Sequence, residues 1–211
     1  MSRRIVHVDG VGTGPRGRSF LYAFPCAYED LAKLGMSGDP MARLQAFSRR
    51  YYEFFDLEQG WLVEAETVRQ ARAWETHWKR VLQEHLAPAP LLVPVGAAGH
   101  TEWFRGALPR LQEARQALAT AGFAVHWPLS AWVREQVRPW RDELDGLERE
   151  VVMQWGGIED WPPAARMPPL AALRDALDAC VALSLPFDAW VSPALAAWFE
   201  RNRLTAARWP A

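Results

Sequence analysis

Two loops of the sequence carry residue types that can bind an anion and act on it. The first, residues 9–18, follows a short β-branched run and contains the spacing GxGxxG. Glycine N–H groups can surround a phosphate, and arginine adds charge and paired donors. The candidate anion-binding residues are Gly12, Gly14, Arg16, Gly17 and Arg18. A hairpin-like connection is the alternative, because Pro15 interrupts the loop and a strand, rather than a helix, is predicted after it.

The second loop, residues 96–102, leads into a predicted helix and ends with His100, Thr101 and Glu102. Unpaired N–H groups and the dipole of a helix N-terminus favour an anion, and they also favour the neutral form of a histidine. A neutral histidine can accept or supply a proton. The candidate catalytic residues are therefore His100, Glu102 and Asp9. The alternative is a capping turn with a solvated histidine.

The sequence gives little support for a metal site. His7 and Asp9 alternate on a predicted strand, and His100 and His126 are two further nitrogen ligands on neighbouring predicted elements. Histidine within a strand is, however, more often a hydrogen-bonded core or surface residue. The two cysteines lie too far apart for a CxxC pair. The sequence predicts no metal site and leaves the cofactor unknown.

The elements that would position these loops predict an α/β (or α+β) fold. Residues 61–127 show the pattern strand, helix, strand, helix, strand, with strands near 61–66, 91–95 and 123–127 and helices after Thr67 and Thr101. Such alternation favours parallel strands joined by crossovers. We therefore expect a small, mostly parallel sheet of about three to five strands packed by helices. Residues 19–24 predict another strand, residues 27–34 a helix closed by Gly35, and the C-terminal third is predicted to be helical.

Composition places limits on domains and partners. The 211 residues predict a single domain, 1–211, with a possible helical C-terminal subdomain at 158–211. The net charge of −1 and the absence of nucleic-acid-binding motifs make nucleic acid an unlikely but not excluded partner. No run approaches the roughly 18 apolar residues of a membrane span, which predicts a cytoplasmic protein without a membrane partner. The basic residues are nearly all arginine, with lysine only at Lys33 and Lys79.

Tryptophan is the outlier, with 12 residues in the chain. Most are expected in the core, but tryptophan is also enriched at binding hot spots. A second feature is a heptad pattern of apolar residues after Ser130, with a bend expected at Pro139. Its positions are Val133, Val137, Trp140, Leu144, Leu147 and Val151.

These features lead to two functional hypotheses. The first is a non-catalytic interaction or assembly module of a bacterial cytoplasmic system, which binds another protein or itself through exposed tryptophan and the heptad helix. The alternative is an α/β enzyme or ligand-binding domain that acts on an anionic or phosphorylated small molecule through the two loops. The alternative requires both loops to meet at one pocket.

Overall fold

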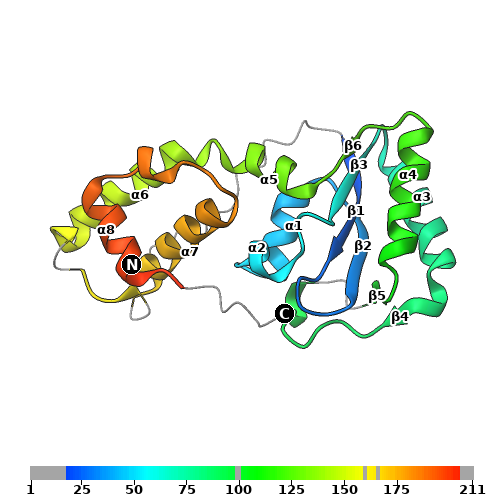
Figure 1. The fold of residues 1–211 in the computed structure, drawn as a ribbon, viewed down its shortest axis with the longest axis horizontal. Helices are drawn as coiled ribbons and strands as arrows, with labels where there is room; N and C mark the ends of the chain where they lie inside the picture. The colour runs from blue at the N-terminus through cyan, green and yellow to red at the C-terminus, as the bar shows by residue number, and fades with distance from the viewer. Residues whose placement is uncertain (1–17, 98–100, 159–160, 165–166, 205–211) are drawn as a thin grey trace, which may run out of the picture. The chain divides into compact units, whose positions relative to one another are not determined.

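A six-stranded antiparallel sheet organises the first part of the chain (Figure 1). The computed structural model describes residues 18–97, 101–158, 161–164 and 167–204, and the sheet with its helices takes those up to Val133. The strand order is β4-β5-β2-β1-β3-β6. The strands are β1 (Ser19–Pro25), β2 (Leu31–Ser37), β3 (Trp61–Ala65), β4 (Leu86–Ala87), β5 (Trp103–Arg105) and β6 (Val125–His126).

The expectation of a mostly parallel sheet is wrong, because every neighbouring pair of strands is antiparallel. The helical connections do not join neighbours. Helix α3 (Val68–Val81) carries the chain from β3 to β4, at the opposite edge of the sheet, and α4 (Leu108–Thr120) leads from β5 back to β6. The crossover rule applies only to parallel strands linked in this way within one sheet.

The helix expected over residues 27–34 is also wrong. The chain turns after β1 and returns as β2, with Phe20 opposite Ser37 and Pro25 opposite Ala32. Strands β1 and β5 pair with the two edges of β2, side chains packed on both faces of the sheet cover its two faces, and residues 31–35 are all buried. A strand buried on both sides shows a continuous apolar run, which periodicity cannot separate from a short buried helix.

Helices cover both faces of this sheet (Figure 1). On one face, Leu82 and Leu111, at or beside α3 and α4, join the core formed by strand residues such as Leu21, Leu34 and Val63. The other face meets α1 (Pro40–Phe47) and α2 (Tyr51–Phe54). There the contacts are aromatic: the Phe47 and Trp103 rings are 5.7 Å apart.

The predicted strand at residues 91–95 and the helix start at Thr101 are not found. Turns and a short 3₁₀ helix (Val95–Ala97) occupy the first region, where three prolines, at 88, 90 and 94, lack the N–H that a strand needs. The second region holds β5, and α4 begins only at Leu108. A further 3₁₀ turn, Gln83–His85, links α3 to β4.

Signals that depend on near neighbours in sequence are confirmed. Thr67 caps α3 by accepting a hydrogen bond from the Gln70 N–H at 3.1 Å. The Gln70 side chain reaches back, although to the N–H of Glu66 rather than of Thr67. Gly122 follows α4 with a φ of +87°, and Ser192 caps the last helix through the Leu195 N–H.

The described residues from Arg134 onward form a second, helical unit. Its helices are α6 (Trp140–Trp155), α7 (Pro168–Ala182) and α8 (Pro193–Asn202), with a 3₁₀ turn at Phe187–Ala189. Helix α5 (Leu129–Val137) precedes them in the chain, and Pro139 separates α5 from α6, so the predicted heptad helix is two helices. None of the helices described between residues 18 and 204 is long and apolar enough to cross a membrane.

Candidate functional site

Both lysines of the chain bind the same carboxylate. The Nζ of Lys33 lies 2.6 Å from Oε2 of Glu102, and the Nζ of Lys79 lies 2.6 Å from Oε1. Lys33 is on β2, Lys79 is on α3, and Glu102 directly precedes β5. The backbone fixes Glu102 beside β2, because its carbonyl accepts a hydrogen bond from the Leu34 N–H at 3.2 Å. Three elements distant in sequence thus meet at one carboxylate.

The Lys33 side chain is completely buried, with an exposed fraction of 0 %, whereas that of Glu102 is 26 % exposed. Burial lowers the pKa of Lys33 to about 8, although its hydrogen bond to Glu102 opposes this fall. The effective penalty of taking an ammonium group out of water is several kcal/mol, and an ion pair returns only part of it. A buried, paired ammonium group therefore contributes little to stability. Buried groups with a strongly shifted pKa are enriched at functional sites.

A second carboxylate supports Lys79 from the same helix. Glu75 lies one turn earlier on α3, and its Oε1 is 3.2 Å from the Lys79 Nζ. Burial acts to lower the pKa of Lys79, but its contacts with Glu102 and Glu75 raise that pKa above its ordinary value. Burial acts to raise the pKa of Glu102, but the two lysines hold it below its ordinary value. Near neutral pH both groups are therefore charged.

Tyr22 and Arg43 extend this cluster from β1 and α1. The Tyr22 hydroxyl accepts a hydrogen bond from the Arg43 Nε at 3.2 Å, and Arg43 also donates to the carbonyl of Ala97. Burial raises the pKa of Tyr22, and the negative charges of Glu102 and Glu75 add to that rise although Arg43 opposes it. The phenol therefore keeps its proton and can donate it.

Gly35 makes the position of Tyr22 possible. The two residues face each other in the pairing of β1 with β2. A Cβ atom at Gly35 would lie 2.4 Å from the Tyr22 hydroxyl oxygen and 2.6 Å from its Cζ. The phenol therefore lies across the glycine, which explains why glycine occurs inside a buried central strand.

We expect Gly35→Ala to lower the free energy of unfolding by about 1–3 kcal/mol, because the methyl group overpacks a filled space and the Tyr22 ring must move. Urea unfolding of the wild type and the variant measures this. Gly38→Ala is the matched control, since its Cβ would meet nothing closer than 3.7 Å, and its stability should stay within about 0.5 kcal/mol of the wild type. Equal stability of the two variants would contradict the close packing of Tyr22 on β2.

No protein-family model, no curated protein and no solved structure matches this chain. What the site can do must therefore follow from its chemistry. The cluster, defined as Tyr22, Lys33, Arg43, Glu75, Lys79 and Glu102, brings together three cationic and two anionic side chains. With all five charged, 3 − 2 leaves one positive charge in excess, which favours an anion over a cation.

Of the two predicted site residues that the structure describes, Arg18 and Glu102, one lies in this cluster. Glu102 belongs to it, but as the residue before β5 rather than at a helix N-terminus. Arg18 is elsewhere: it pairs with Glu64 at 2.7 Å, and Glu64 also contacts the His126 Nε2 at 2.8 Å. The remaining predicted residues lie outside the described residues; they are Asp9, Gly12, Gly14, Arg16, Gly17 and His100.

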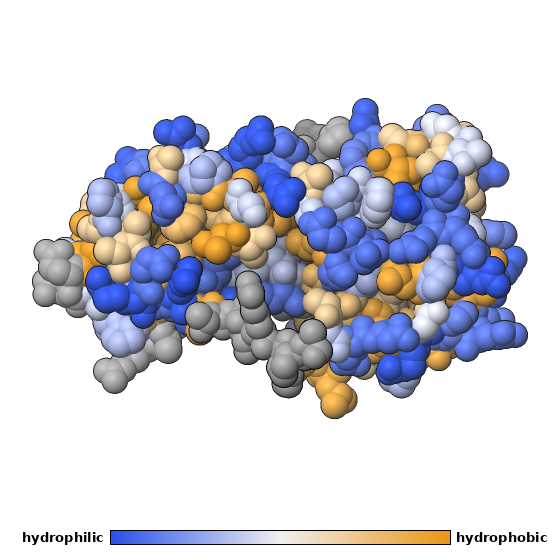
Figure 2. Space-filling view, in the orientation of Figure 1, coloured by the Kyte–Doolittle hydropathy of each residue, from blue (hydrophilic) through white to orange (hydrophobic). Residues whose placement is uncertain are grey.

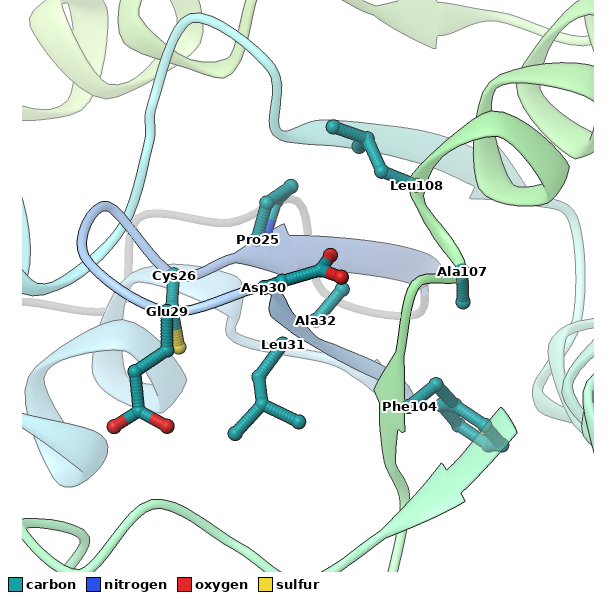
Figure 3. Close-up of a pocket in the computed structure, with 9 residues that line it drawn as sticks. All are labelled: Pro25, Cys26, Glu29, Asp30, Leu31, Ala32, Phe104, Ala107 and Leu108. Carbon is teal, nitrogen blue, oxygen red and sulfur yellow. The ribbon is translucent and has the colours of Figure 1, made fainter.

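A separate pocket lies at the turn between β1 and β2 (Figure 3). In that view the Asp30 carboxylate extends toward Ala107 and Leu108, whereas the carboxylate of Glu29 points away from them. Burial raises the pKa of the neighbouring Cys26 thiol to about 12, so this thiol stays protonated and is a weak nucleophile. The described residues that line this pocket include two acidic ones and no basic one, so the pocket disfavours an anion. The lining residues are Pro25, Cys26, Glu29, Asp30, Leu31, Ala32, Phe104, Ala107 and Leu108.

Few of the described tryptophans are exposed, although the interaction hypothesis expects tryptophan on the surface. Four indoles are buried, and of the others only Trp127, 51 % exposed, belongs to the exposed class, with the Arg115 guanidinium 4.0 Å from its ring centroid. The heptad positions Leu144 and Val151 are buried. On the face drawn in Figure 2, hydrophobic side chains lie between hydrophilic ones. The interaction function stays a prediction.

Proposed function

We propose that this protein is an enzyme that acts on a phosphate ester at the cluster of Tyr22, Lys33, Arg43, Glu75, Lys79 and Glu102. One observation carries the proposal: the two lysines of the chain, on different elements, bind one carboxylate at 2.6 Å while one of them is fully buried. A buried ammonium group is a poor device for stability. It is suited to catalysis, because burial lowers the pKa of Lys33 to about 8, close to neutral pH.

The side chains have complementary roles in this proposal. Arg43 and Lys79 bind the phosphate oxygens and neutralise the charge that grows on them during the reaction. Lys33 donates a hydrogen bond to a phosphate oxygen, and in its neutral form its lone pair accepts a proton from the water that attacks the phosphorus atom. The P–O bond to the alcohol breaks as the new P–O bond forms, and the leaving oxygen takes a proton from solvent. Tyr22 donates a hydrogen bond to the bound ester, and Glu75 holds Lys79 in place from the preceding helical turn.

A phosphate group fits the cluster better than a carboxylate does. Three cations contribute to the cluster, and Glu102 balances only one of them while Glu75 balances another. The remaining positive charge together with the charge released when Glu102 moves can offset the two charges of a phosphate monoester. A phosphate diester carries one negative charge, which the remaining positive charge of the cluster offsets without release of Glu102.

The experiment is a panel of substrates with and without Mg²⁺: p-nitrophenyl phosphate, bis(p-nitrophenyl) phosphate, p-nitrophenyl acetate, and labelled single-stranded and duplex DNA. We expect turnover of one of the phosphate esters. Lys33→Met and Lys79→Met should each lower kcat/KM for it by about 100-fold or more, in the range found when a charge-stabilising donor is removed.

Arg110→Met is the matched control, because Arg110 is an exposed cation of the same unit that pairs only with Glu113 in the described contacts. Its kcat/KM should equal that of the wild type. Turnover of p-nitrophenyl acetate but of no phosphate ester would overturn phosphate esters as the substrate class. Turnover that survives both lysine substitutions would remove the cluster as the active site.

A further inference from the structure

The Glu102 carboxylate binds both lysines of the chain, each through a different oxygen. Its two oxygens are used as two phosphate oxygens would be, one by Lys33 and the other by Lys79, each at 2.6 Å. A substrate that binds both lysines therefore needs the place that Glu102 occupies. The two anions cannot occupy this place together, since like charges at contact distance repel each other.

Exposure shows which of these side chains an incoming anion meets first. The Lys33 side chain is 0 % exposed, whereas those of Glu102 and Lys79 are 26 % and 30 % exposed. Solvent thus reaches Glu102 and Lys79 but does not reach Lys33. Glu102 is the carboxylate bound to the buried ammonium group, so an anion that binds Lys33 takes the place of Glu102 there.

The Glu102 side chain can move while its backbone stays in place. Its carbonyl is hydrogen-bonded to the Leu34 N–H, so the main chain is tied to β2. The side chain is not fully enclosed, and rotation about its χ angles is fast for a partly exposed residue. Release of the lysines therefore requires no change in the sheet.

We infer that Glu102 is an internal competitor for the anion site, which occupies the position of the substrate's phosphate and is displaced from Lys33 when the substrate binds. This inference rests on the proposed function and adds the regulation of the same site. In the empty site Glu102 is thereby paired with both lysines, and anions of low charge are excluded because they do not replace Glu102 at both lysines. Anions of higher charge bind more strongly and gain access.

The test is the affinity for inorganic phosphate and pyrophosphate, measured by calorimetry, of the wild type, of Glu102→Gln and of Glu113→Gln. The amide keeps a hydrogen-bond acceptor but removes the competing charge. We expect Glu102→Gln to bind phosphate at least roughly tenfold more tightly than the wild type does. Glu113→Gln changes an exposed carboxylate of the same unit and should bind as the wild type does.

The outcomes separate this inference from the proposed function. The wild type binds phosphate in the first outcome, and Glu102→Gln binds it equally or more weakly. That result overturns the inference, because Glu102 then only positions the lysines. No binding by either protein overturns the proposed anion site itself. If the amide variant does not fold, Glu102→Asp replaces it: its shorter side chain cannot hold both lysines, so equal or weaker phosphate binding by it also overturns the inference.

Discussion

Glu102→Leu is expected to lower the free energy of unfolding by about 3–5 kcal/mol, far more than an average substitution of a partly exposed residue. The substitution leaves the Lys33 ammonium group, which is fully buried, without its carboxylate. Lys79 adds little to the loss, since it is partly exposed and keeps Glu75 as a partner. The physical cause is therefore one unpaired charge inside the sheet unit.

A double substitution tests this cause. In Lys33→Met/Glu102→Leu the buried charge is absent, and a buried pair replaced by apolar residues of similar size is often neutral or stabilising. The double variant should therefore recover most of the stability that Glu102→Leu loses. Urea unfolding at pH 7, followed by tryptophan fluorescence, measures all three proteins.

Glu113→Leu serves as the control for the loss of an exposed carboxylate and should change the free energy of unfolding by no more than about 0.5 kcal/mol. A loss below about 1 kcal/mol in Glu102→Leu would mean that Lys33 is neutral at pH 7 or finds another partner. That result would contradict the charged pair as the state of the site.

Local features of the fold were predictable because they depend on residues close in sequence. Thr67 and Ser192 cap helices through an N–H three residues later, and Gly122 adopts a positive φ at a helix end. The sheet was not predictable in this way. That β1 pairs with both β2 and β3, and in the antiparallel direction, depends on contacts between segments that sequence periodicity does not encode.

The site was largely missed for the same reason. The expected helix at residues 27–34 gave Lys33 no role, although a lysine within the apolar run Leu31–Met36 is itself a sign of a buried charge. Glu102 was selected from the sequence for a helix N-terminus that does not exist there. Its true partners come from β2 and α3, which only the strand order brings beside β5.

The two lysines are expected to titrate on opposite sides of the ordinary lysine pKa of 10.5: Lys33 at about 8 and Lys79 above 10.5. Burial causes the low value, and the contacts of Lys79 with Glu102 and Glu75 outweigh its partial burial to cause the high one. Because lysine occurs only at these two positions, protein labelled with ¹³C at the lysine Cε gives two signals. Lys79→Met assigns them by removing one.

The same difference predicts how stability depends on pH. Between pH 8 and 10.5 the unfolded chain keeps a proton on Lys33 that the folded protein has lost, so Lys33 contributes a rise in the free energy of unfolding across this window. The buried thiols of Cys26 and Cys180, whose pKa burial raises to about 12, contribute a fall above pH 9, so the Lys33 contribution is measured as a difference between the wild type and a variant without this lysine. The Lys33 contribution to the free energy of unfolding changes by about 3 kcal/mol over this range, since one pKa unit corresponds to about 1.4 kcal/mol. The raised pKa of Lys79 has the opposite effect: its contribution to stability is lost as pH rises through the folded value, above 10.5.

Lys33→Met is the variant that isolates this contribution. The free energy of unfolding of the wild type minus that of Lys33→Met should rise by about 3 kcal/mol between pH 8 and 10.5, whereas the difference between the wild type and Arg110→Met should not change with pH. A Lys33 signal that titrates at or above 10.5 would contradict the predicted effect of burial. It would also remove Lys33 as a proton acceptor near neutral pH, because an ammonium group with that pKa is almost fully protonated there.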